Sequence, residues 1–120
     1  MKKFSTYLVL LVFIACADKQ LSHTETAKIV VESFYQKDNS KLKKYTTAES
    51  YASFISIQDM MTAAESGASD FNIVQEIVDR DIAWVKFTTS YEEKPETFKL
   101  VQEEGQWVVT EKGLREKGPF

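Results

Sequence analysis

Few side chains in this sequence are suited to chemistry at neutral pH, and their number limits what that chemistry could be. The 120 residues contain one histidine, His23, and one cysteine, Cys16. A general base needs a partner and a cleft, and a zinc site needs three or four ligands. No second histidine or cysteine is available to complete either set. We therefore expect His23 to be a solvated residue near the start of a helix, and we expect neither a metal nor a cofactor.

Cys16 stands where an apolar run ends and charged residues begin. A basic start and a short apolar run have the layout of a secretory signal, and the run from residue 4 to residue 15 is shorter than the roughly 20 residues of a membrane span. The stretch "FIAC", residues 13–16, resembles the lipobox of bacterial lipoproteins, although Phe13 replaces the usual leucine and Ile14 is bulky. The resemblance implies that Cys16 is acylated and holds the protein on a membrane of the bacterial cell envelope. A buried cysteine in a helix is the alternative.

The carboxylates and tyrosines form no recognisable catalytic pattern. Asp79 and Asp81 flank a predicted hairpin turn, where aspartate is common. Several glutamates cluster at turns without the spacing of a calcium loop, and we interpret them as solvated charge. Tyrosine hydroxyls could donate into a cavity, but buried tyrosines usually pack with one satisfied hydroxyl. The glutamates are Glu92, Glu93, Glu103 and Glu104, and the tyrosines are Tyr35, Tyr45, Tyr51 and Tyr91.

The large aromatic side chains are candidates for a binding site. Core packing is their simpler role, and concave ligand sites are usually lined by such residues as well. We select four of them as pocket or interface residues: Tyr51, Phe54, Trp84 and Phe87.

The length and charge of the chain bound its organisation. We divide the sequence into a signal peptide (1–15), a lipidated tether (16–22), one folded domain (23–112) and a flexible tail (113–120). The 105 residues after the signal are enough for one modest core. They carry 13 basic and 18 acidic residues, a net charge of −5. Without a concentrated basic stripe, a nucleic-acid partner is not expected.

Three helices are predicted in the first half of the domain. Ser22 and Glu25 have capping-box spacing, and apolar residues recur at helical intervals through a helix over 23–37. A short helix follows over 40–45, with a lysine-rich face that we expect to be solvated: Lys41, Lys43 and Lys44. A second capping box, Thr46 with Glu49, predicts a third helix that continues to Ser66.

Four strands are predicted after residue 70, where the apolar pattern loses its helical period. They cover 71–79, 82–91, 96–103 and 106–112. The first and last connections are two-residue turns, Arg80-Asp81 and Glu104-Gly105, and residues 92–95 make a longer turn. Helices followed by strands predict an α+β fold, with three N-terminal helices packed on a curved four-stranded antiparallel meander sheet.

Both faces of this sheet carry apolar residues. A two-residue first turn places Ile73, Ile77, Ile82 and Trp84 on one face, and Val74, Val78, Ala83, Val85 and Phe87 on the other. The side taken by Phe98, Leu100, Trp107 and Val109 stays open, because a one-residue slip exchanges the faces. We expect one face to meet the helices and the other to meet a second subunit, a ligand or a lipid surface.

Three parts of the domain carry a family resemblance: the first helix with Asp38-Asn39-Ser40 after it, residues 81–85, and residues 98–109. The clearest marker is "LVQEEGQWVV" (residues 100–109). They are similar to small bacterial lipoproteins of a domain-of-unknown-function family within the nuclear-transport-factor-2-like superfamily. The resemblance implies a cone of helices against a curved sheet, with an apolar cavity between them and frequent dimerisation through the sheet. It implies no catalytic residue here, because no family motif carries an aspartate onto a matching position.

These observations favour a membrane-anchored envelope lipoprotein whose non-catalytic domain binds a small apolar ligand or a protein partner. The alternative is a cone-fold enzyme of the isomerase or dehydratase type, which would use a buried carboxylate and a tyrosine. A cavity that contains both groups would favour the alternative.

Overall fold

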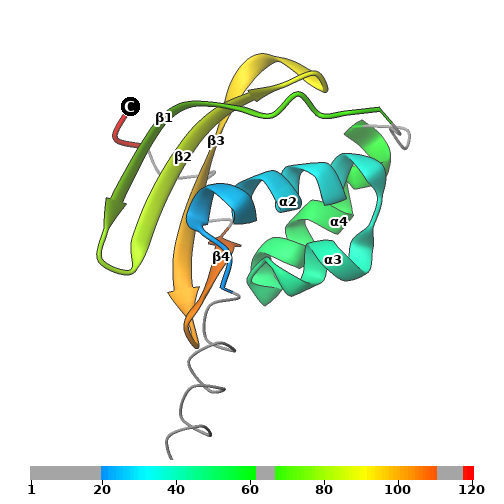
Figure 1. The fold of residues 1–120 in the computed structure, drawn as a ribbon. Helices are drawn as coiled ribbons and strands as arrows, with labels where there is room; N and C mark the ends of the chain where they lie inside the picture. Colours follow the sequence, from blue (N-terminus) through cyan, green and yellow to red (C-terminus); the bar gives the residue numbers. More distant parts are fainter. Residues whose placement is uncertain (1–19, 62–66, 111–117) are drawn as a thin grey trace, which may run out of the picture.

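The fold is described from a computed structural model, which describes residues 20–61, 67–110 and 118–120. Three helices cover one face of a curved antiparallel sheet of four strands, as Figure 1 shows. This architecture confirms the predicted fold class. The predicted signal peptide (1–15), Cys16, the predicted end of the third helix at 62–66, and residues 111–117, which include most of the predicted C-terminal tail (113–120), lie outside the described residues.

Helix α2, His23–Gln36, begins and ends where the sequence predicts. The backbone N–H of Glu25 donates to Ser22 Oγ, and the backbone N–H of Ser22 donates to Glu25 Oε1, each at 3.1 Å. This capping box satisfies two backbone donors that the first turn would otherwise leave unpaired. The helix ends at Lys37, which adopts the left-handed conformation at φ 60°.

Helices α3, Asn39–Lys44, and α4, Ala48–Met61, follow at once. The predicted capping box at Thr46 is wrong, because Thr47 caps α4 by accepting the backbone N–H of Ser50 at 3.2 Å. The Thr46 hydroxyl instead donates to the carbonyl of Leu42 at 2.7 Å. Thr46 also forms an isolated bridge with Val109, so this residue ties the helices to the sheet. The three lysines of α3 are exposed, as expected: Lys41, Lys43 and Lys44.

The sheet is a meander in the order β1 (Asn72–Asp79), β2 (Ile82–Thr89), β3 (Glu92–Glu103) and β4 (Gln106–Thr110). Both predicted two-residue turns are present, with positive φ at Arg80 (59°), Glu104 (53°) and Gly105 (76°). The predicted longer turn at 92–95 is wrong, because β3 already begins at Glu92. The pairing register between β2 and β3 shifts across this stretch. Pro95 is tolerated there because an irregular ladder needs no donor from it.

The pairing register decides which residues face the helices. Ala83 pairs with Leu100, Val85 with Phe98, and Leu100 with Val109. Directly paired residues project from the same face of a sheet. The residues whose side the sequence leaves open therefore lie on the face that carries Ala83. They are Phe98, Leu100, Trp107 and Val109. The buried sheet residues on this inner face are Ala83, Val85, Phe87, Phe98, Leu100, Trp107 and Val109.

A β-bulge changes the predicted faces of β1. The register shifts between Ile73 and Gln75, so Ile73 pairs with Phe87 and lies on the inner face. The expectation that Ile73 shares a face with Trp84 is thus wrong, because the bulge inserts one residue and reverses the alternation. Val74, at the bulge, is 50% exposed.

The second face of the sheet is partly covered in the described residues. Trp84 lies there, with Lys99 Nζ 5.5 Å from its ring centroid, and Gly118 lies close against the same ring. Ile77 and Ile82 are each about two-fifths exposed, at 41% and 40%. A homodimer through this face stays a prediction. Among the helices of the described residues, none has the length and apolar character that crossing a bilayer requires.

Gln58 of α4 ties together the three helices, and replacing it should destabilise the protein. Its side chain is buried, and Nε2 donates to the carbonyl of Phe34 at 2.8 Å and to Asn39 Oδ1 at 3.0 Å. We expect Gln58→Ala to lower the free energy of unfolding by about 1–3 kcal/mol, because it removes both bonds from a buried position. Chemical denaturation measures this loss. Met60→Ala on the exposed side of α4 is the matched control, and an equal loss in both variants would contradict the prediction.

Candidate functional site

A small cavity lies where α2, α4 and β3 meet. Its volume is about 140 Å³, which is close to the roughly 150 Å³ that suffices to hold benzene in a protein core. Six of the seven lining residues are apolar or aromatic, and the seventh is a carboxylic acid. The lining residues are Val31, Phe34, Tyr35, Phe54, Ile57, Glu96 and Phe98. We call this space the Glu96 cavity.

Glu96 enters the cavity because of its place on β3. It pairs with Phe87 and precedes Phe98 by two residues, so its side chain projects from the inner face. Its Oε2 atom is buried and has no hydrogen-bond partner among the described residues. Burial, followed by the negative charge of Glu92, raises the pKa of Glu96 from its ordinary 4.5 to about 7. Both effects act in the same direction because each penalises the ionised form.

Tyr35 provides the second polar group of the cavity wall. Its hydroxyl donates to Glu92 Oε1 at 3.2 Å, and its ring stacks on Tyr91 with centroids 4.6 Å apart. Burial raises the pKa of the Tyr35 hydroxyl, and the negative charges of Glu96 and Glu92 raise it further. The hydroxyl therefore stays protonated and acts as a hydrogen-bond donor at neutral pH. Glu92, which we interpreted from sequence as solvated loop charge, is exposed but serves as its acceptor.

The cavity contains one carboxyl group, that of Glu96, and its pKa of about 7 lies close to neutral pH. Such a group can accept or donate a hydrogen bond, and it can take up or release a proton. No group of three or more histidine, cysteine or acidic residues in the described part of the chain is arranged to hold a metal ion. What the walls offer a ligand is apolar contact and one polar anchoring point.

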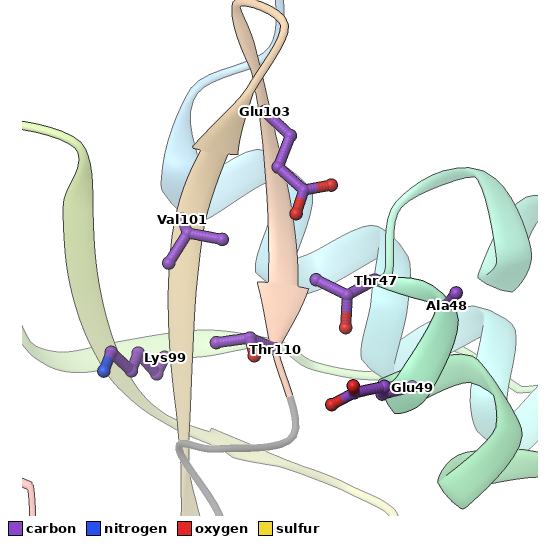
Figure 2. A pocket seen from close by; sticks show the side chains of 7 residues that line it. All are labelled: Thr47, Ala48, Glu49, Lys99, Val101, Glu103 and Thr110. Atoms are coloured by element: carbon purple, nitrogen blue, oxygen red, sulfur yellow. The ribbon is translucent and has the colours of Figure 1, made fainter.

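A second hollow is larger but less specific. It encloses about 460 Å³ between the start of α4 and the outer side of β3 and β4. Figure 2 shows the carboxylates of Glu49 and Glu103 at the opening between these elements, with Lys99 directed away from them. Glu49 and Glu103 are exposed, so the hollow offers a ligand no buried carboxyl group. We therefore take the Glu96 cavity as the candidate site.

The structure does not bring the four predicted pocket residues together. Phe54 lines the Glu96 cavity, and Tyr51 lies three residues earlier on α4, half-buried against the core. Phe87 is fully buried, with its ring 4.9 Å from that of Phe98 between centroids. Trp84 lies on the opposite face of the sheet.

His23 is not the solvated residue that the sequence predicts. Its side chain is only 18% exposed, and Nε2 lies 2.6 Å from Glu76 Oε1 on β1. Its ring also meets the edge of Trp107, with centroids 5.8 Å apart. His23 therefore fastens the start of α2 to the sheet, and it is absent from the walls of the Glu96 cavity.

Sequence reasoning missed Glu96 as a site residue, although one signal was present. Glu96, Phe98 and Leu100 alternate along β3, and alternate residues of a strand share a face. A glutamate in register with two buried apolar residues predicts an inward carboxylate. The turn predicted at 92–95 makes Glu96 the first residue of its strand, and the direction of a side chain at a strand end is poorly defined by sequence.

Comparisons with known proteins identify the type of fold. No protein-family model matches the sequence, and no curated protein matches it. Among solved structures, a Campylobacter jejuni protein described as a candidate NTF2-like transpeptidase is similar, with a TM-score of 0.53 and 13% identity. The match covers 72% of this chain and 94% of that one. The fold of this chain is thus of the NTF2-like (nuclear-transport-factor-2-like) type, as the resemblance implied, and such a likeness carries no function with it.

Proposed function

From an NTF2-like fold with a lone carboxyl group in its apolar cavity, we propose a ligand-binding domain tethered to the bacterial envelope. The domain holds a small, mostly apolar molecule in the Glu96 cavity, and Glu96 anchors the single polar group of that molecule. The tether is an acylated Cys16.

The observation that carries this proposal is the buried Oε2 of Glu96, which lacks a partner within the described residues. A buried polar atom without a hydrogen bond costs about 1–3 kcal/mol. Native structures contain few such atoms, and each needs an explanation. A hydrogen bond from a bound molecule would satisfy this one. The remaining wall residues supply an apolar surface of the kind that small-molecule sites use.

The support for the tether lies in the sequence alone. The segment "FIAC" ends a short apolar run, and the first described helix begins seven residues after Cys16. Seven extended residues reach at most about 25 Å. An acylated protein of this design would keep its domain close to the bilayer.

Filling the cavity should abolish binding of a benzene-sized compound. We expect Ile57→Phe, which enlarges one wall residue, to weaken binding by at least about tenfold, because a cavity near 150 Å³ holds little more than one ring. Isothermal titration calorimetry and NMR titration of the purified protein with small neutral and charged phenyl compounds measure this. Added bulk costs about 1–3 kcal/mol of stability, so thermal unfolding confirms that the variant remains folded.

Met60→Phe is the matched control for this experiment, because Met60 lies on the same helix and is 80% exposed. It should leave binding unchanged. Wild-type protein that binds none of the compounds, or an Ile57→Phe variant that binds them equally well, would contradict the proposed function.

A second candidate function is proton transfer within the same cavity. It is favoured by the pKa of Glu96, which lies at about 7 and so matches what an acid–base catalyst needs. The cavity wall also contains a tyrosine, Tyr35, although its hydroxyl already donates to Glu92.

Exchange of hydrogen for deuterium separates the two functions. A compound that binds the cavity and carries an acidic C–H bond is incubated with the protein in D₂O and followed by NMR. Deuterium incorporation that disappears in Glu96→Gln identifies an enzyme. A compound that binds but gains no deuterium would exclude proton transfer to that compound and would support binding as the function.

A further inference from the structure

We propose that the ligand of the Glu96 cavity is a small organic cation, an amine with an apolar body of about one ring. This inference rests on the proposed function and names its ligand class. It follows from the charges, the rings and the hydrogen-bonding groups that surround the cavity.

The charges around the cavity are of one sign. Glu96 lies in the wall, and Glu92 lies beside it as the acceptor of the Tyr35 hydroxyl. No lysine, arginine or histidine is among the described residues that line the cavity. An anionic ligand would meet two carboxylates without a compensating charge, and burying it would be costly. An ammonium group would supply the missing opposite charge.

The apolar wall is largely aromatic. The rings of Phe34 and Phe54 are tilted against each other with centroids 5.4 Å apart, and those of Phe54 and Phe98 meet edge to face with centroids 6.1 Å apart. Tyr35 packs edge-on against Phe34 at 5.0 Å. Aromatic rings attract cations through their faces, and such rings are the usual walls of ammonium sites. The same rings bury the apolar body of the ligand.

The hydrogen-bonding groups also favour a donor ligand. The Tyr35 hydroxyl already donates a hydrogen bond to Glu92. Oε2 of Glu96, in contrast, accepts no hydrogen bond from the described residues. A protonated amine brings several N–H donors to that position. A neutral alcohol would bring one, and a hydrocarbon would bring none.

The ionisation of Glu96 is compatible with such a ligand. Because its pKa lies at about 7, the carboxyl group loses its proton at neutral pH at little cost when a cation approaches. The proton passes to water, and the resulting ion pair is held by hydrogen bonds to a charged acceptor, which are stronger than those between neutral groups.

The cavity lies away from the end of the domain at which the tether enters. Gln20, within the tether, donates to the carbonyl of Gly105 at the β3–β4 turn. Tyr35 lies twelve residues after His23 on α2, which is about 18 Å along a helix. The cavity is thus at the opposite end of α2 from the tether.

Benzylamine, benzyl alcohol, toluene and benzoate test the inference, because they share one ring and differ in their polar group. Each is titrated into purified full-length protein at pH 7 and followed by calorimetry. We expect benzylamine to bind at least about tenfold more tightly than benzyl alcohol, and benzoate not to bind. Glu96→Gln should weaken the binding of benzylamine by at least about tenfold and change the affinity for toluene by no more than about twofold. Glu93→Gln, at an exposed position of the same strand, should change neither affinity.

The outcomes separate this inference from the proposed function. Neutral compounds that bind as tightly as benzylamine would overturn the inference that the ligand is a cation. Benzylamine binding that is unchanged in Glu96→Gln would do the same. Either result would leave the proposed binding cavity in place. Failure of all four compounds to bind would overturn both.

Discussion

The variant Glu96→Gln should be more stable than the wild type at pH 8 and about equally stable at pH 4. The expected gain at pH 8 is at most about 3 kcal/mol, since a difference of one between two pKa values corresponds to about 1.4 kcal/mol and the pKa of Glu96 rises from 4.5 to about 7 on folding. Glutamine resembles the protonated acid in shape and cannot ionise. The cost of a buried charge therefore disappears.

The sign of this effect follows from which state binds more protons. Between pH 4.5 and 7 the folded protein keeps the proton on Glu96, while the unfolded chain has released it. Stability falls with rising pH wherever the folded state binds more protons. The loss therefore begins near pH 4.5 and is complete above pH 7. The charge that raises the pKa of Glu96 beside burial is that of Glu92 on the same strand. Tyr35 from α2 shares the cavity wall as a neutral hydroxyl, and α4 contributes only apolar residues to it.

Urea denaturation at pH values from 4 to 8 measures this difference. Glu93→Gln removes an exposed carboxylate from the same strand and should follow the wild type throughout. If the free energies of unfolding of the wild type and Glu96→Gln follow parallel curves against pH, with no divergence between pH 4.5 and 7, folding does not raise the pKa of Glu96 and the prediction is wrong.

The elements of the fold could be predicted because their signals are local. The capping box of Ser22 and Glu25 and the Glu104-Gly105 turn act within a few residues, and each fixes one boundary of an element. The alternation of β2 and β3 likewise follows from the sequence. These local preferences all agree with the overall architecture, which is the usual condition for a sequence to specify one fold.

The alternation along β3 indicates that Glu96 points inward, but the site around it could not be predicted from sequence, because it depends on register and on long-range packing. A single inserted residue at Ile73–Gln75 moved Ile73 to the inner face, and no local pattern marks such a bulge. The choice between Thr46 and Thr47 as the cap of α4 depends on the bridge from Thr46 to Val109. Tyr35 and Glu96 meet across sixty residues of sequence, and only the packed fold brings them to one cavity.

Replacement of Cys16 should abolish acylation of the chain and its stable attachment to the membrane. Each buried methylene of an acyl chain contributes about 0.8 kcal/mol, so two or more long chains attach a protein stably to a bilayer. A serine at this position lacks the thiol that forms the thioether. We expect wild-type protein to lose residues 1–15 and to gain the mass of its acyl groups. The Cys16→Ser variant should be neither cleaved nor acylated. Intact-mass spectrometry and metabolic labelling with a fatty acid measure both.

Phe13→Leu is the matched control for this experiment, because it restores the leucine usual at that position of a lipobox and retains Cys16. It should be acylated at least as completely as the wild type. The intact mass is more informative than fractionation alone, because an uncleaved apolar run in Cys16→Ser could itself associate weakly with a bilayer. A native mass without acyl groups in the wild type would remove the tether from the proposed function. The cavity and its ligand would be unaffected, because they depend on Glu96 and its neighbours.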